Sequence, residues 1–81
     1  MNLFITAYPA QLPTFQLEEN NKIISSKNCN YSDIIHTTAE YLNKNNIGNI
    51  FILGSSIYAE RINQQLYDNF HNQVHVERVE E

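Results

Sequence analysis

Short runs of apolar residues mark the strands expected in this chain. In Met1–Tyr8, apolar side chains occupy both sides of an extended backbone, and Asn49–Leu53 is a continuous apolar run. Both patterns are typical of strands that are buried on their two faces. Pro9 and Pro13 follow the first segment and should end it, because proline lacks the N–H that a strand ladder needs.

Three further segments have shorter apolar patterns. Thr14–Leu17 and Lys22–Ser25 flank the polar sequence Glu18-Glu19-Asn20-Asn21. Asparagine tolerates positive φ and suits a tight turn, so the pattern predicts a β-hairpin. The last segment, Gln73–Val79, alternates valines with His75 and Glu77 and predicts a final strand, followed by the solvated tail Glu80-Glu81.

Apolar residues at helical spacing predict two helices. The first begins at Asn30, expected to cap it together with Asp33, and ends at Asn45 and Asn46, expected to adopt the left-handed cap conformation. Its expected buried stripe is Tyr31, Ile34, Ile35, Thr38, Ala39 and Leu42. The second follows the turn Gly54-Ser55-Ser56, with Ser55 or Ser56 as its cap and the stripe Tyr58, Ala59, Ile62, Leu66 and Phe70.

These elements predict one α/β domain over residues 1–81, with a small mixed sheet and the order β-β-β-α-β-α-β. Two parallel crossover helices should join the last three strands in parallel, and the hairpin supplies an antiparallel part. The pattern fits either a three-layer or an open two-layer sandwich. The order of the strands in the sheet stays open.

Composition excludes several classes of protein. Nine acidic against five basic residues give a net charge of −4, with no basic run, which disfavours a nucleic-acid binder. Cys29 is the only cysteine, so neither an internal disulfide nor a multi-cysteine zinc site is expected. The apolar runs are far shorter than the roughly 20 residues of a membrane span. We therefore expect a cytoplasmic protein without membrane association, cofactor or metal.

The loop Gly54-Ser55-Ser56 is the best candidate for a ligand site. A buried strand that leads through glycine into a helix presents free N–H groups and the positive end of the helix dipole, which favour anions. Tyr58 could stack on a ring, and Tyr8 would join this site if the first strand runs parallel to Asn49–Leu53. The alternative is that Gly-Ser-Ser serves only as a strand-to-helix turn.

Catalytic patterns are weak. His36, His71 and His75 match no zinc motif. A Ser55–His75–Glu77 constellation lacks a nucleophile-elbow sequence. A ribonuclease H-type nuclease starts from a comparable sheet but needs an acidic residue on its first strand, and Leu3–Tyr8 has none. Cys29 precedes a helix start, where a lowered thiol pKa is one reading and a packing role the other. We lean toward a protein that is not an enzyme.

Tyrosines provide the remaining signal. Tyr41 and Tyr67 fall beside the apolar stripes of the two helices, and half-exposed tyrosines often anchor protein interfaces. A chain this short has a thin core, which favours a homodimer.

A resemblance rests on four features: the shortness of the chain, its richness in Asn and Ile, the strand that starts at residue 1 and the segment Ile50–Tyr58. In these features the chain resembles small α/β accessory proteins of low-GC bacteria and their phages. The resemblance implies a protein that binds and modulates or inhibits a host or defence protein. We therefore expect a non-enzymatic protein-interaction module; the alternative is a small nucleotide- or anion-binding protein that uses Gly54–Ser56.

Overall fold

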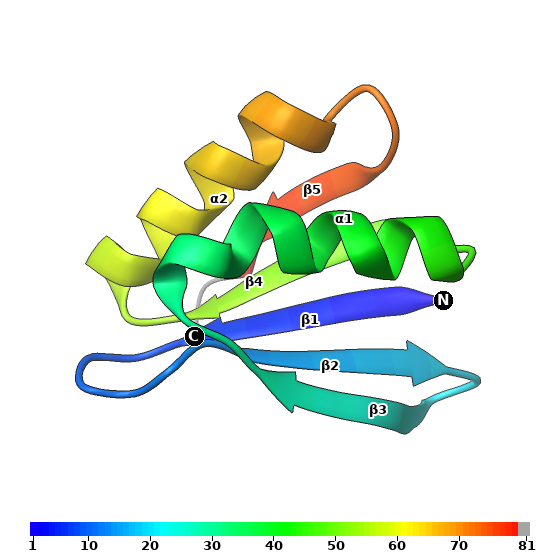
Figure 1. Cartoon of the computed structure of the whole chain (residues 1–81), viewed down its shortest axis with the longest axis horizontal. Helices are drawn as coiled ribbons and strands as arrows, with labels where there is room; N and C mark the ends of the chain where they lie inside the picture. The colour runs from blue at the N-terminus through cyan, green and yellow to red at the C-terminus, as the bar shows by residue number, and fades with distance from the viewer. Residues whose placement is uncertain (80–81) are drawn as a thin grey trace.

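The computed structural model describes residues 1–79, and its elements follow the expected order (Figure 1). They are β1 (Asn2–Ala7), β2 (Thr14–Glu19), β3 (Lys22–Asn28), a 3₁₀ turn (Tyr31–Asp33), α1 (Ile34–Lys44), β4 (Asn49–Gly54), α2 (Ser56–Phe70) and β5 (His75–Arg78). The α/β class and the order β-β-β-α-β-α-β are confirmed. The predicted tail, Glu80 and Glu81, lies outside the described residues.

The strands form one mixed sheet in the order β3-β2-β1-β4-β5. β1 pairs antiparallel with β2, and β2 antiparallel with β3, whereas β1–β4 and β4–β5 are parallel pairs. β3, β4 and β5 therefore run in the same direction, as the crossover rule predicts. The strand order, which the sequence left open, places β1 in the centre.

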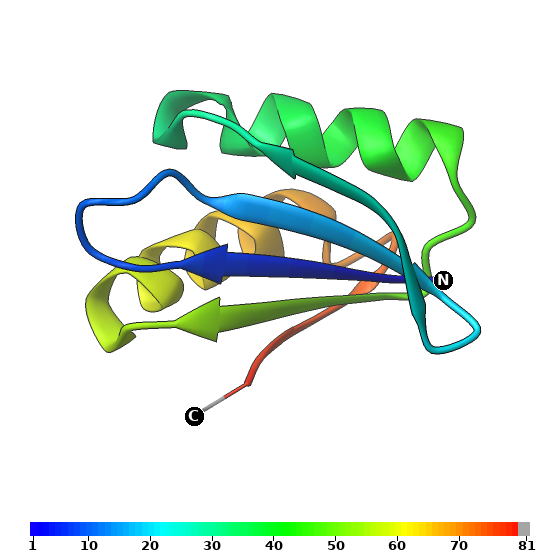
Figure 2. The same cartoon turned by 90° about the horizontal axis from the view of Figure 1, so that it is seen from below.

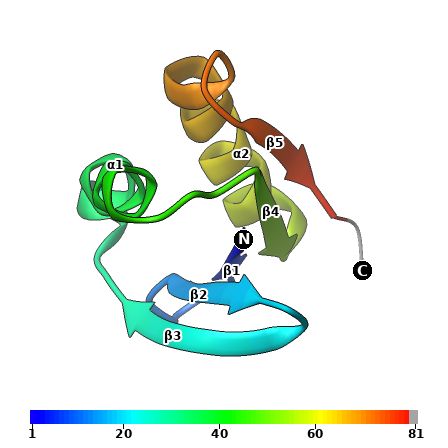
Figure 3. The same ribbon diagram turned by 90° about the vertical axis from the view of Figure 1, so that its right-hand side faces the viewer.

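Both helices lie on the same face of this sheet (Figure 3). The β3–α1–β4 and β4–α2–β5 connections both advance in the same direction across the sheet, and right-handed crossovers that do so put their helices on one side. The fold is thus an open two-layer sandwich. The expectation that β1 and β4 are covered on both faces is wrong, since no described helix covers the second face.

The core lies between the helices and the covered face of the sheet. The stripe predicted on α2 is buried, except that Tyr58 is only half-buried. In α1, Ile34 and Thr38 are buried as predicted, but Tyr31 is exposed because it belongs to the preceding 3₁₀ turn. The buried apolar residues are Leu3, Ile5, Ala7, Phe15, Leu17, Ile34, Ile47, Ile50, Ile52, Ala59, Ile62, Leu66, Phe70, Val74 and Val76.

The hairpin turn confirms the role expected of its asparagines. Asn20 and Asn21 have φ values of 53° and 65°, as the central residues of a type I′ turn require. β2 and β3, the two strands of this hairpin, are longer than predicted. A register shift between Leu17 and Glu18 interrupts their regular pairing.

The predicted helix caps are mostly wrong. The Asn30 side chain makes no capping hydrogen bond, because the chain first forms a 3₁₀ turn in which Asp33 N–H donates to the Asn30 carbonyl (2.9 Å). Asn45 ends α1 with extended backbone rather than in the left-handed region, and its side-chain amide donates to the Tyr41 carbonyl (3.1 Å). Ser55 occupies the N-cap position of α2, but its side chain makes no capping bond.

Gly54 is required where β4 meets β1. Its φ is 128°, and a Cβ built on it would lie 1.9 Å from the Ala7 carbonyl oxygen. We expect Gly54→Ala to lower the free energy of unfolding by about 3 kcal/mol, measured by urea denaturation. Gly48→Ala is the matched control, because its Cβ would meet nothing within 4 Å, and it should change stability by less than about 1 kcal/mol. Equal losses in the two variants would contradict this account.

Thr38 leaves a polar atom without a partner in the core. The residue is fully buried, and its Oγ1 has no hydrogen-bond partner within the described chain. Thr38→Val keeps the shape and removes the unpaired hydroxyl, so the free energy of unfolding should rise by about 1 kcal/mol in thermal or urea denaturation. Thr37→Val is the control and should lower stability, because the buried Thr37 hydroxyl hydrogen-bonds Cys29.

Candidate functional site

The loop at the end of β4 has the position expected of an anion site, but one of its backbone amides is already bonded within the sheet. β1 and β4 are parallel, so Tyr8 and Ser55 follow strands that end at the same edge of the sheet. The Ser55 N–H, however, donates to the Ala7 carbonyl (3.0 Å). One amide of the loop therefore completes the sheet, which favours the reading of Gly54-Ser55-Ser56 as a strand-to-helix turn. The side chain of Ser56 lies outside what the structure describes.

Tyr58 lines a small cavity of about 200 Å³ together with Tyr31, Arg61, Ile62 and Gln65. The rings of Tyr31 and Tyr58 lie 5.7 Å apart at an angle of 45°. Burial, and to a lesser extent the neighbouring Tyr58, raises the pKa of Tyr31. The cavity lies along α2 and does not include Tyr8 or Gly54, so the predicted ligand residues do not share it.

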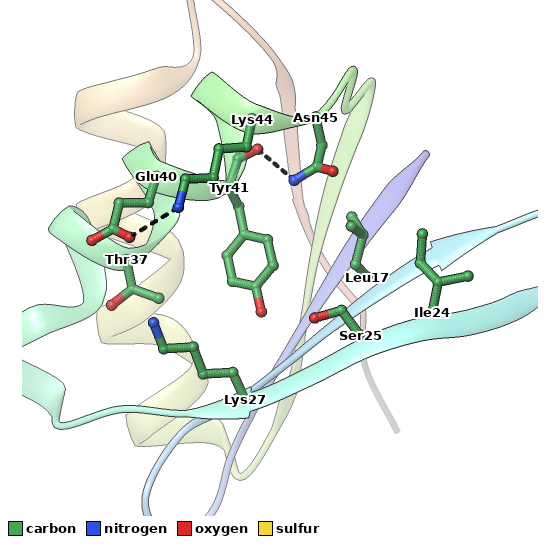
Figure 4. Close-up of a pocket in the computed structure, with 9 residues that line it drawn as sticks. All are labelled: Leu17, Ile24, Ser25, Lys27, Thr37, Glu40, Tyr41, Lys44 and Asn45. Carbon is green, nitrogen blue, oxygen red and sulfur yellow. Dashed lines mark hydrogen bonds and ion pairs between the residues drawn. The ribbon is translucent and has the colours of Figure 1, made fainter.

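A larger groove opens between α1 and the β2–β3 hairpin (Figure 4). Its volume is about 430 Å³. Apolar, hydroxyl and charged side chains line it from both sides: Leu17, Ile24, Ser25, Lys27, Thr37, Glu40, Tyr41, Lys44 and Asn45. We call this space the α1–β3 groove.

A second cavity of about 460 Å³ continues the groove toward the start of α1. It shares Lys27, Thr37 and Glu40 with the first, and it adds Leu12, Asn28, Cys29, Asn30, Asp33 and His36. Together the two cavities follow β3 from Ile24 and α1 as far as Asn45. This length suits an extended chain better than a compact ligand.

Tyr41 anchors the α1 wall of the groove. The residue is half-buried, and its ring stacks on Phe15 with centroids 5.7 Å apart and planes within 6°. Figure 4 shows its hydroxyl pointing from α1 toward β3, between Ser25 and Lys27. Tyr67, the other predicted interface residue, is exposed on α2 and stacks on His71 at 4.7 Å. The two tyrosines therefore belong to different surfaces.

The charges along the groove are unevenly paired. The Glu40 carboxylate is engaged on both sides, by His36 Nε2 at 2.7 Å and by Lys44 Nζ at 3.9 Å. In the described part of the chain, no carboxylate oxygen lies within the 4.0 Å of an ion pair from Lys27 Nζ. Lys27 is thus a cation available to a ligand.

β3 borders the groove as an edge strand. It pairs only with β2, so the N–H and C=O groups of its outer edge have no strand partner. Ile23 and Ile24 are about half exposed on it (49% and 52%). The sequence did not lead us to predict Ile24, Lys27 or Lys44 as residues of a binding site. The adjacent isoleucines were the available signal, since neighbouring residues of a strand cannot both enter one core.

The structure does not bring Ser55, His75 and Glu77 together as a catalytic group. His75 pairs with Asn49 at the beginning of β4, whereas Ser55 follows the end of that strand. His75 therefore lies at the end of β4 opposite Ser55, and Glu77 lies beside Phe51 in the middle of that strand. Within residues 1–79, no three His, Cys, Asp or Glu side chains are grouped so that they could hold a metal ion.

Neither α1 nor α2, the two α-helices in the described range, combines the length and apolar character that crossing a membrane demands.

Cys29, which lines the second cavity, should react slowly. Burial raises the pKa of its thiol, opposed in part by the Thr37 hydrogen bond, so the thiolate is scarcer than in a free cysteine. We expect alkylation by iodoacetamide near neutral pH to be several-fold slower than for an unfolded control in urea. The pKa of Cys29 is higher in the folded than in the unfolded state. The stabilisation gained by keeping this thiol neutral is therefore lost as the pH rises through the folded-state pKa. A folded rate equal to the control would contradict the raised pKa.

Comparisons with protein-family models, with curated proteins and with solved structures found no match to this chain.

Proposed function

We propose that this protein is a non-enzymatic interaction module that binds an extended segment of a partner protein along β3 and the α1–β3 groove. The observation that carries the proposal is that a seven-residue edge strand, whose outer edge has no strand partner, lies beside a groove of about 430 Å³. Strand addition at a sheet edge beside a groove is a recurring mode of peptide recognition.

The backbone of β3 would supply affinity that does not depend on sequence. A segment added beside β3 pairs with the free edge and extends the sheet by one strand. The opposite edge, β5, has only four residues and offers a shorter template. β3 is therefore the edge better suited to a partner segment.

Side chains of the groove would supply specificity. Successive residues of an added strand alternate between the faces of the sheet, so every second one lies on the side of α1. There it meets the apolar surface of Ile24 and the ring and hydroxyl of Tyr41. Tyrosine is one of the residue types that most often dominate binding energy, so Tyr41 is the expected anchor of the segment.

Charge favours an acidic segment. All three lysines of the chain lie on β3 or α1, at Lys22, Lys27 and Lys44, although the protein as a whole has a net charge of −4. β3 contains two lysines and no acidic residue, so pairing with β3 of a second copy would bring like charges together without compensation. A strand with Asp or Glu would instead pair with Lys27.

The resemblance to accessory phage proteins supports a host or defence protein as the source of that segment. Binding of a small anion at Gly54–Ser56 is the weaker alternative. The shared edge of Tyr8 and Ser55 favours it, and the use of the Ser55 amide by Ala7 counts against it.

Selection from a random peptide library tests the proposed function. We expect the protein to select peptides that combine alternating apolar residues with acidic ones. Ile24→Glu should weaken their binding by about tenfold or more in fluorescence titrations, because it places a carboxylate in the groove. Lys27→Glu should also weaken it, and the loss should shrink with added salt.

Ile57→Glu is the matched control. Ile57 is 63% exposed on the first turn of α2, away from the groove, and its substitution should leave peptide binding unchanged. Ser55→Ala should also have no effect on peptides. Failure to select any peptide, or equal losses in Ile24→Glu and Ile57→Glu, would reject the groove. A phosphate affinity that Ser55→Ala abolishes would favour the anion-binding alternative.

A further inference from the structure

Figure 2 shows the strands in front of α2, so it looks onto the face of the sheet opposite the helices. The centre of this face is apolar. The register places Phe4 of β1 beside Phe51 of β4, and their rings stack at 5.4 Å. Gln16 of β2 is the neighbour of Phe4 on its other side, and Glu77 of β5 is the outer neighbour of Phe51. Leu53, two residues beyond Phe51, shares this face. We call this surface the open face.

The central strands are more apolar than expected for strands that the described residues cover on one face only. β4 reads Asn-Ile-Phe-Ile-Leu-Gly, an apolar run typical of parallel strands that are covered on both sides. Ile50 and Ile52 are buried beneath the helices, whereas Phe51 and Leu53 are only half-buried. β1, β4 and β5 form the parallel part of this mixed sheet, and parallel strands with so apolar a sequence are usually covered on both faces, so we expect the open face to be covered.

The polar residues of the open face indicate what covers it. Around the phenylalanines the register places mostly neutral amides and hydroxyls, including Asn2, Asn49, Thr6 and Gln16. Asn49 donates to Asn2 (3.0 Å), and Asn2 donates to Glu18 (3.1 Å). An amide is both donor and acceptor, so such a surface can satisfy a copy of itself across a twofold axis. The register puts no Lys or Arg of residues 1–79 on this face. Of its carboxylates, Glu18 accepts from Asn2, and Glu77, beside Phe51, lies 3.2 Å from His75 Nε2.

We propose that a second copy of this chain covers the open face, with the Phe4–Phe51 pairs of the two copies packed against each other in a twofold dimer. This inference goes beyond the proposed peptide groove, which lies on the opposite side of the sheet. The dimer leaves β3 and the groove accessible, so each copy presents one peptide site.

The area of the open face determines how tightly the two copies are expected to bind each other. Five strands about 4.8 Å apart and about 20 Å long give a footprint of roughly 450 Å² per copy. Corrugation by side chains raises the buried accessible area to about 1,000–1,200 Å² in total, at the lower end of specific interfaces. A reversible dimer with a Kd of about 1–100 µM follows, rather than a permanent one.

Sedimentation equilibrium of the purified chain without peptide, from about 1 to about 500 µM, tests the dimer. The wild type should show a monomer–dimer equilibrium. Phe51→Lys should raise the Kd by about tenfold or more, because it buries a charge at the centre of the interface. Gln16→Lys should do the same, and it keeps the test valid if Phe51→Lys fails to fold, since it replaces a polar, half-buried residue. Far-UV circular dichroism verifies that each variant is folded.

Two control variants separate this dimer from others. Tyr67→Lys tests the exposed helix surface of α2, and Ile24→Glu tests pairing through β3; both should dimerise like the wild type. A wild type that stays monomeric would overturn the proposal and leave the open face to another protein. Dimerisation unaffected by Gln16→Lys, or abolished by Tyr67→Lys or Ile24→Glu, would overturn it as well. None of these results depends on peptide binding, so the groove and the dimer fail separately.

Discussion

The parallel pairing of β1 with β4 joins the two halves of this chain. It extends from Asn2 opposite Asn49 to Ala7 opposite Gly54, and the backbones approach so closely at its end that only glycine fits. The pairing makes β1 the centre of the sheet, with the hairpin on one side and β4 and β5 on the other. The direction of both crossovers, and hence the side on which both helices pack, follows from this arrangement.

One-sided helix packing separates two surfaces of different character. On the helix side, α1 lies over the hairpin and leaves a groove with lysines, hydroxyls and the Tyr41 ring. On the other side, the phenylalanines of β1 and β4 lie among neutral amides, with Glu77 beside Phe51. The first surface has an unpaired strand edge and net positive lining, which suit an acidic peptide. The second is self-complementary and nearly uncharged at its centre, which suits a copy of the same chain.

Sequence reasoning identified parts of the candidate site but could not assemble them. Tyr41 was predicted as an interface residue from its place beside an apolar stripe, and it does line the groove. Lys27 gave no local signal, and the adjacent isoleucines Ile23 and Ile24 did not show that they border a groove, because that depends on β3 being an edge strand. The Gly54 loop looked like an anion site in isolation. Its pairing with Ala7, a residue far away in sequence, uses one of the amides on which that reading relied.

Local patterns in the sequence are enough to predict the elements of this protein, their order, the asparagine turn of the hairpin and most of the buried stripe of α2. Those features depend on local periodicity and on the φ values that each residue type tolerates, so a short stretch of sequence specifies them. The strand order, the bare face of the sheet and the groove beside β3 could be known from the folded structure alone. These depend on pairings between distant segments such as β1 and β4, and an apolar run reads the same whether its second face meets a helix, another chain or water.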